Sequence, residues 1–156
     1  MAEPPTDLEL RCETCSRRID ADHPGGLVVD TAKAEARALA LADADHHQHT
    51  ALAAFRAETL HVAIAAAEHD PPVARWVALH DRCPWPQHLP PADRGYVIDA
   101  DSIRTTWQRA LTWTVHLSGK PWLDGTDWRK LWAAVLHGSD DRVWVRTRRD
   151  HIRVLG

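Results

Sequence analysis

The sequence predicts an α+β fold, in which a small β unit carries a helical insertion and precedes a Trp-rich helical half that ends in a short β-hairpin. Three observations predict this fold. Short segments of alternating apolar and polar residues flank two clusters of Cys and His. An Ala-rich segment with helical periodicity separates these clusters, and seven of the eight Trp residues fall within 85–144.

The first half is expected to contain short strands around a turn, followed by helices. Thr31 is a good N-cap and Pro71-Pro72 ends the helical run. Residues 43–49 interrupt the apolar period, either as a loop or as an exposed helical turn. We expect a disordered tail at 1–7, strands at 8–11, 16–19 and 27–29, turns at 12–15 and 22–26, and helices at 32–42 and 50–68.

The second half is expected to contain two helices packed through Trp. Ser102 is placed to cap a helix that runs to Leu117, and Thr126 to cap the next one, which Gly138 ends. The apolar positions fall on one face of each helix. These faces comprise Ile103, Trp107, Ala110, Leu111 and Thr114 in the first helix, and Trp128, Leu131, Trp132 and Val135 in the second. A strand is expected at 96–98, and a hairpin at 142–155.

Two pairs of residues have the spacing of metal ligands. Cys12 and Cys15 form a Cys-x2-Cys pair, and His80 and Cys83 repeat that spacing. Thiolate and imidazole suit Zn²⁺, which takes four ligands tetrahedrally. A Cys₃His set leaves no open coordination position, so the sequence predicts one structural zinc ion. This interpretation makes residues 8–98 a zinc-binding unit with a helical insertion at about 31–69, and residues 99–156 a helical pair with a basic ribbon.

Other roles for these residues remain open. The Cys-x2-Cys pair has the spacing of a redox motif, and the three cysteines are alternatively free and buried. The fourth ligand is alternatively His88 or His23. His46, His47 and His49 are a further candidate for this ligand, or for a second metal, although a polar loop or surface turn is the simpler explanation.

The metal motif resembles one half of a LIM-type or treble-clef zinc module. The resemblance rests on Cys12–Cys15, on Ile19 and Gly25–Leu27, and on His80–Cys83. It departs from these modules in the separation of the ligand pairs, because residues 16–79 lie between them and the modules have roughly 15–25 residues there. The resemblance implies a role in binding a protein or a nucleic acid.

The segment Asp22-His23-Pro24-Gly25-Gly26 resembles part of the motif of HNH nucleases. The resemblance implies that His23 activates water beside a divalent metal ion. The later Asn and His of that motif have no match in this sequence. The alternative is a solvent-exposed turn.

A basic segment closes the chain. Five Arg residues oppose a single Asp between positions 142 and 153, in a chain whose net charge is −3. Cations with an interleaved aromatic ring suit phosphate contact and base stacking. The candidate nucleic-acid-binding residues are Arg142, Trp144, Arg146, Arg148, Arg149 and Arg153. The alternative is a solvated sheet face with Asp140 and Asp141 nearby as charge partners.

These observations bound the function. The odd number of cysteines, three, favours a reducing compartment, and neither a signal peptide nor a membrane span is evident, so we expect a cytoplasmic location. The excess of Arg over Lys, with much Ala, indicates a GC-rich bacterial source. We expect a non-enzymatic, zinc-stabilised regulatory protein that contacts nucleic acid or a protein, without a small-molecule substrate. The alternatives are an HNH-like nuclease and a purely structural adaptor.

Overall fold

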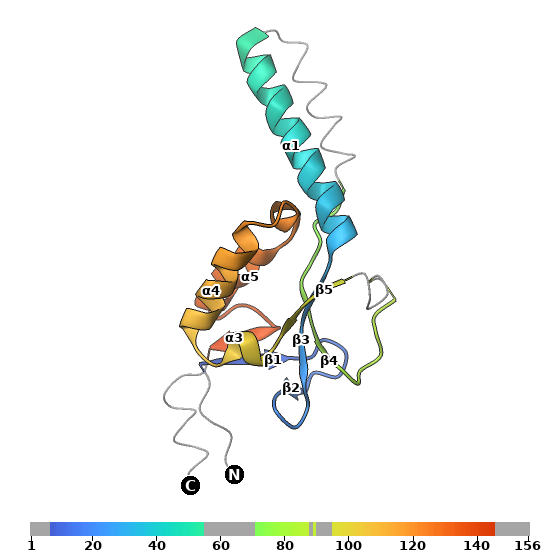
Figure 1. The fold of residues 1–156 in the computed structure, drawn as a ribbon, viewed down its shortest axis with the longest axis vertical. Coiled ribbons are helices and arrows are strands. Elements are labelled where there is room, and N and C mark those ends of the chain that lie inside the picture. Colours follow the sequence, from blue (N-terminus) through green and yellow to red (C-terminus); the bar gives the residue numbers. More distant parts are fainter. Residues whose placement is uncertain (1–6, 55–70, 88, 90–94, 146–156) are drawn as a thin grey trace.

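The computed structural model describes residues 7–54, 71–87, 89 and 95–145. Within these ranges it contains both helices and sheets, which confirms the α+β class. In chain order the elements are β1 (Leu8–Arg11), β2 (Arg18–Ile19), β3 (Gly25–Asp30), α1 (Thr31–Ala54), β4 (Val77–His80), β5 (Gly95–Asp99), α3 (Asp101–Arg104), α4 (Trp107–Ser118), the 3₁₀ helix η2 (Leu123–Gly125), α5 (Trp128–Leu136) and β6 (Val143–Val145). Figure 1 shows their arrangement.

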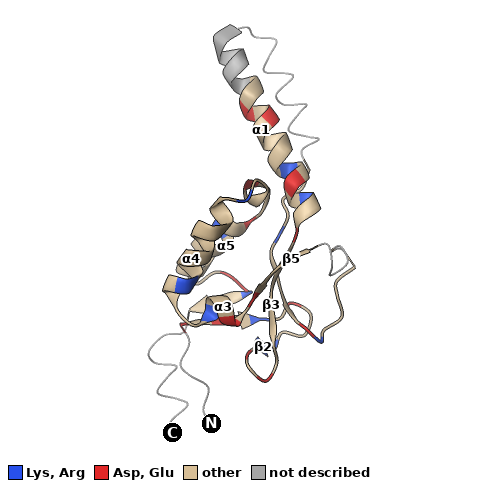
Figure 2. Cartoon of the chain, viewed as in Figure 1, with Lys and Arg blue, Asp and Glu red and all other residues tan. Residues whose placement is uncertain are grey.

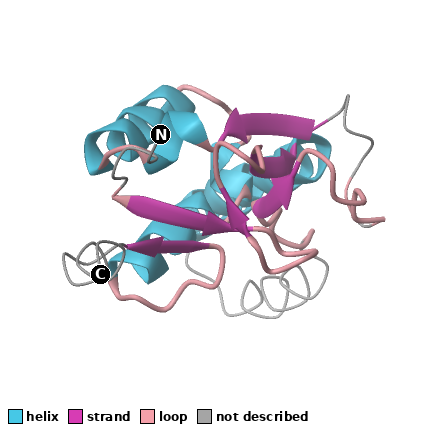
Figure 3. Ribbon diagram, turned by 90° about the horizontal axis from the view of Figure 1, so that it is seen from below, coloured by secondary structure: helices cyan, strands magenta, loops and turns pink. Residues whose placement is uncertain are grey.

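The described strands form two three-stranded antiparallel sheets, which lie beside the helices in Figure 3. The first sheet has the order β2-β1-β6, with Leu10 opposite Ile19 on one side and Leu8 opposite Val145 on the other. The second has the order β4-β3-β5 and is centred on Leu27. Because β6 pairs with β1, the first sheet contains strands from both predicted halves of the chain.

Trp side chains form much of the core between the sheets and the C-terminal helices. Trp76, which precedes β4, and Trp128 of α5 are almost completely buried, and their ring centroids lie 5.0 Å apart. Tyr96 and Trp122 extend the cluster at centroid distances of 6.3 Å from Trp76. Large aromatic rings bury much apolar area each, so this cluster anchors α5 against the second sheet.

Helix α1 starts directly after β3 and projects from the rest of the protein (Figure 1). Acidic and basic residues alternate near its base (Figure 2). The side chain of Asp30, rather than that of Thr31 as predicted, caps the helix, because Asp30 Oδ1 accepts a 2.9 Å hydrogen bond from Lys33 N. Residues 43–49 are helical, which settles the alternative left open for them. The predicted helix at 50–68 lies mostly outside the described residues.

The single helix predicted from Ser102 to Leu117 is wrong, since two helices, α3 and α4, occupy this segment. Thr106 has extended backbone angles, and its side chain accepts a 3.2 Å hydrogen bond from Arg109 N. A new N-cap therefore starts α4 there. Leu111 is 63% exposed, so its predicted place on the packed face is also wrong.

The end of α5 follows the prediction. Trp128, Leu131 and Val135 are buried on one face, and Trp132 packs partly buried beside them. Gly138 has a φ of 66°, and Ser139 N donates to Ala134 O at 2.9 Å. A left-handed residue with this backbone bond ends many helices and favours glycine. Strand β6 begins where the hairpin was expected, but the second strand of that hairpin lies outside the described residues.

Within the described part of the chain, no helix is both long enough and apolar enough to cross a membrane.

Candidate metal centre

Four side chains from two distant segments meet in one cluster. The Sγ atoms of Cys12, Cys15 and Cys83 and one ring nitrogen of His80 all lie within 4.8 Å of one another. Cys15 Sγ lies 3.2 Å and Cys83 Sγ 3.6 Å from His80 Nδ1. The three cysteines form no disulfide. These are the four predicted ligands, and the folded chain brings all of them together.

The turn between β1 and β2 positions the first pair of thiols. Cys12 N donates to Arg17 O at 2.9 Å, and Ser16 N donates to Cys12 O at 2.8 Å. Ser16 has a φ of 60°, the left-handed conformation that lets the chain reverse within the turn. Cys12 is buried and Cys15 is exposed, so the site lies at the protein surface.

The end of β4 positions the imidazole. His80 is the last residue of that strand and is only 8% exposed. Its Nε2 lies 2.9 Å from the carbonyl oxygen of Arg18 in β2, so Nε2 carries the proton and donates it in this bond. In the neutral imidazole this tautomer leaves the lone pair on Nδ1, the nitrogen that faces the thiols. Cys83 follows in a turn in which Cys83 N donates to His80 O at 3.2 Å.

Backbone hydrogen bonds also link the segments that carry the candidate ligands. Glu13 N in the first turn donates to Ala78 O of β4 at 2.8 Å. Asp81 N, beyond β4, donates to Pro24 O at 2.9 Å. Gly25 of β3 lies opposite His80, and a Cβ at Gly25 would overlap the carbonyl oxygen of Leu79. The close approach of these backbones therefore requires glycine beside the ligand.

The thiols differ in acidity. Burial raises the pKa of Cys12, but backbone N–H groups of His80, Cys15 and Thr14 lower it more, and the pKa lies at about 6. Burial and the neighbouring thiols of Cys12 and Cys15 raise the pKa of Cys83 to about 11. One thiolate thus forms near neutral pH, whereas further ionisation places negative charges side by side. A cation relieves this repulsion, so metal binding would release protons.

The cluster fits a tetrahedral metal ion such as zinc. With Zn–S near 2.3 Å and Zn–N near 2.0–2.1 Å, a tetrahedral centre holds sulfur and nitrogen about 3.5 Å apart. The two sulfur–nitrogen distances above, 3.2 and 3.6 Å, lie on either side of that value. Three thiols and one imidazole also form a donor set that suits zinc better than it suits magnesium or calcium. The residues present therefore form a candidate metal site.

The candidate histidines whose side chains are described, other than His80, lie outside this cluster. His23 is exposed, its Nδ1 lies 3.3 Å from Asp20 Oδ1, and its ring centroid is 6.1 Å from that of His80. His46 and His47 are exposed on α1. The side chain of His49, and His88 as a whole, lie outside the described residues. Within the described part of the chain, no second group of metal-binding residues comes together.

The basic C-terminal segment is only partly described. Arg146, Arg148, Arg149 and Arg153 lie outside the described residues. Trp144 in β6 is 49% exposed, and the guanidinium of Arg11 lies 4.9 Å from the centroid of its ring. Arg142 differs from the exposed position that we expected, because its side chain is only 6% exposed. Its cationic group is therefore directed into the protein, and its place among the predicted nucleic-acid-binding residues is wrong.

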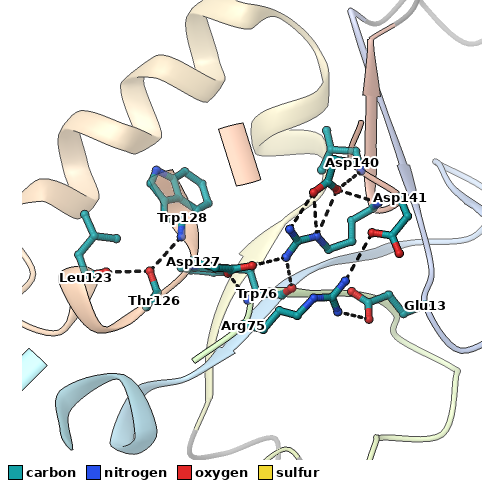
Figure 4. A network of polar contacts seen from close by, with 11 residues as sticks. Glu13, Arg75, Trp76, Leu123, Thr126, Asp127, Trp128, Asp140 and Asp141 are labelled. Atoms are coloured by element: carbon teal, nitrogen blue, oxygen red, sulfur yellow. Dashed lines mark hydrogen bonds and ion pairs between the residues drawn. The ribbon is translucent and has the colours of Figure 1, made fainter. Parts of the chain in front are cut away.

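Arg142 belongs to a polar network that the sequence reasoning missed. Its Nη1 donates to Asp127 Oδ2 and its Nη2 donates to Asp140 Oδ2, both at 2.7 Å. Nη1 also donates to the carbonyl oxygen of Trp76 at 2.8 Å, and Asp127 Oδ1 accepts from Trp76 N at 2.7 Å. Figure 4 shows how Asp127, Asp140 and Trp76 converge there. Only Asp140, two residues before Arg142, offered a local signal for this pairing.

The chain matches no protein-family model, no curated protein and no solved structure at a significant level.

Proposed function

We propose that this chain is a non-enzymatic, zinc-stabilised binding protein, and that it contacts nucleic acid through the end of its chain. Zn²⁺ would be held by Cys12, Cys15, His80 and Cys83. The observation that carries the proposal is the convergence of these four donors within 4.8 Å of one another. Because the proposed protein binds a partner without catalysing a reaction, its role would be regulatory or accessory. A protein partner instead of nucleic acid is the alternative outcome of the binding test below.

A structural role for the metal is supported by the donor set. Four protein donors fill a tetrahedral shell, so no position remains for a water molecule or a substrate. Catalytic zinc sites keep such a position open.

The metal would cross-link two sheets. Cys12 and Cys15 follow β1, in the first sheet, while His80 and Cys83 lie at the end of β4, in the second. Structural zinc binds with an apparent free energy on the order of 10 kcal/mol. Because the four donors converge only in the folded chain, this free energy would stabilise the folded state and not the unfolded one. Loss of metal would then weaken the joint between the sheets more than either sheet by itself.

The contact surface is proposed to start at Trp144. The exposed indole of Trp144 lies on β6, which is an edge strand of its sheet, and Arg11 lies over the ring. The sequence then continues with Arg146, Arg148, Arg149 and Arg153. Arginine pairs with phosphates and an exposed indole stacks on bases, which favours a single strand or a groove as the ligand. Arg142 is left out of this surface.

A binding experiment tests the surface. A fluorescein-labelled DNA, single- or double-stranded, is titrated with the protein at 50–200 mM salt, and the anisotropy gives the affinity. We expect the affinity to fall with salt, and the triple variant Arg146→Glu, Arg148→Glu, Arg149→Glu to bind at least about 10-fold more weakly. The control is Arg129→Glu, because Arg129 is exposed on α5, outside this surface. Equal binding by the triple variant and the wild type would reject the surface.

The same protein tests the enzymatic alternative. An HNH-like nuclease needs a divalent ion at His23, whose nearest described carboxylate is that of Asp20. We expect no cleavage of plasmid DNA with Mg²⁺ or Mn²⁺. Cleavage that His23→Ala abolishes would replace the non-enzymatic proposal with the nuclease.

A further inference from the structure

A surface hollow lies where α3 meets α4, and it shares no lining residue with the metal cluster. Its volume is about 400 Å³, and its lining residues are Ser102, Arg109, Thr112, Trp113 and His116. Pockets for small organic ligands commonly measure about 300–1,000 Å³. The hollow is therefore large enough for a ligand the size of a mononucleotide.

The fold gathers these side chains on one face. The four lining residues of α4 occupy positions i, i+3, i+4 and i+7, which fall on the same side of an α-helix. Ser102 reaches the hollow from α3. The break at Thr106, where the chain is extended before α4 starts, sets α3 apart from the axis of α4. A continuous helix from 102 to 117, as the sequence alone suggested, would place Ser102 on that same axis.

The ionisable groups that line the hollow are basic. Arg109 is exposed and forms no ion pair with any described residue. This separates it from Arg104, Arg129 and Arg142, which bond to carboxylates of their own chain. His116 is the second such group, and of the described residues in the lining none is acidic. The charge of Arg109 is therefore free to pair with an anionic ligand, in a chain that is acidic overall.

An aromatic ring and further polar groups flank this charge. Trp113 is half-buried in the lining, and its ring is held against that of His116 at a centroid distance of 5.3 Å. Tyr96 Oη lies 3.4 Å from His116 Nε2, and Lys120 Nζ lies 5.8 Å from the centroid of the Tyr96 ring. The hydroxyl of Thr112 donates to Gln108 O, so its lone pairs remain to accept a hydrogen bond.

We propose that this hollow binds one nucleotide unit, with the phosphate on Arg109 and the base against Trp113. Guanidinium groups bind phosphate oxygens in a bidentate manner, and bases of any sequence stack on aromatic rings. The ligand is a free nucleotide or one residue of a single strand, since both present the same phosphate and base. The proposal goes beyond the one above, because it uses neither the metal nor the C-terminal arginines.

Calorimetric titration with AMP tests the site on the full chain. We expect AMP to bind, and adenosine, which lacks the phosphate, to bind at least about 10-fold more weakly. Arg109→Ala should weaken AMP binding by a similar factor without unfolding the protein, since Arg109 is exposed. Thr112→Glu should weaken it too, because the added carboxylate repels the phosphate. Arg129→Ala, an exposed arginine on the adjacent helix, is the matched control and should bind as the wild type does.

Competition then separates the two sources of the nucleotide. If oligothymidylate displaces AMP, the site takes a residue of a single strand; if AMP binds and the oligonucleotide leaves it in place, the site takes the free nucleotide. Either result supports the hollow as a nucleotide site. The proposal would be overturned if AMP gave no heat of binding and the oligonucleotide showed no binding that depends on Arg109. Equal affinity of the wild type and Arg109→Ala for AMP would also overturn it. The triple C-terminal variant should bind AMP normally, so this test and the previous one fail independently.

Discussion

Arg142 Nη1 donates a hydrogen bond to Asp127 Oδ2 at 2.7 Å, between side chains that are 6% and 13% exposed. The same guanidinium bonds to Asp140 and to the carbonyl oxygen of Trp76. One cation therefore joins the start of α5, the approach to β4 and the start of β6. The neighbouring pair of Arg75 and Glu13 links the approach to β4 with the metal-binding turn. These bonds link Trp76 of the Trp core with Glu13, which lies between Cys12 and Cys15.

Arg142→Ala should destabilise the protein strongly. The substitution leaves the carboxylates of Asp127 and Asp140 buried without their counter-charge, and breaking a buried pair in this way costs about 3–5 kcal/mol. Urea unfolding followed by Trp fluorescence measures the change. Arg129→Ala serves as the control, because its partner Asp124 is 66% exposed and surface pairs contribute about 0–1 kcal/mol. Equal stability of the two variants would show that Arg142 does not hold the structure together.

Asp140 should make the protein sensitive to acid. Burial raises the pKa of this carboxyl group, but hydrogen bonds from Arg142 lower it more, so the pKa lies below its ordinary value. The resulting stability is fully present above the unfolded pKa of about 3.9 and is lost as the pH falls through the lower, folded pKa. We expect the difference in unfolding free energy between the wild type and Asp140→Asn to shrink below about pH 4. Loss of any bound metal in acid would affect both proteins alike, so this difference isolates Asp140. A difference independent of pH would contradict the assignment.

Substitutions of His80 should separate its role as a ligand from its role in packing. His80→Cys restores a four-donor shell of Cys₄ type and should keep one metal ion per chain. His80→Ala removes both the ligand and the bond to Arg18 O, and should lower metal affinity at least about 10–100-fold. A chromogenic chelator in competition for zinc measures both affinities. Retention of metal by the Ala variant would assign the fourth ligand to another group.

Gly125→Ala should loosen the attachment of α1. A Cβ at this position would overlap the carbonyl oxygen of Ala34, so η2 and α1 would have to separate. We expect the thermal midpoint to fall by several degrees, because a loss of 1 kcal/mol alone shifts it by about 2–4 °C in a chain of this size. Gly119→Ala is the matched control, since its Cβ would meet only His116 O, at 3.8 Å. A similar thermal midpoint for both variants would mean that η2 and α1 can move apart without loss of stability.

The sequence predicted the four members of the Cys and His cluster because their signal is local within each pair. Cys12 with Cys15, and His80 with Cys83, each show the spacing of a tight turn. The strand at 8–11 was predicted for the same reason, since alternation of apolar and polar residues is visible within four residues. The strand expected at 96–98 is part of β5. The assembly of both pairs into one cluster was a hypothesis, and the 4.8 Å grouping supports it.

Interactions between distant residues were the ones that sequence reasoning missed. Strands β1 and β6, which pair, lie more than a hundred residues apart in the sequence. Arg142 and Asp127, which form a bond inside the protein, lie fifteen residues apart. A buried arginine looks in the sequence like its exposed neighbours, so Arg142 was placed with the basic segment. At Ser102 and Thr106 two good capping residues compete, and propensity alone does not decide between them. The hollow on α4 follows from that same break.

The central claim is that one zinc ion joins the two sheets through four named side chains. Native mass spectrometry of the purified chain, before and after treatment with a chelator, tests it most directly. We predict one zinc ion per folded chain, its loss in the double variant Cys12→Ser with Cys83→Ser, and a broader charge-state distribution once the metal is gone. A compact chain without bound metal, indistinguishable from the chelated protein, would contradict the account.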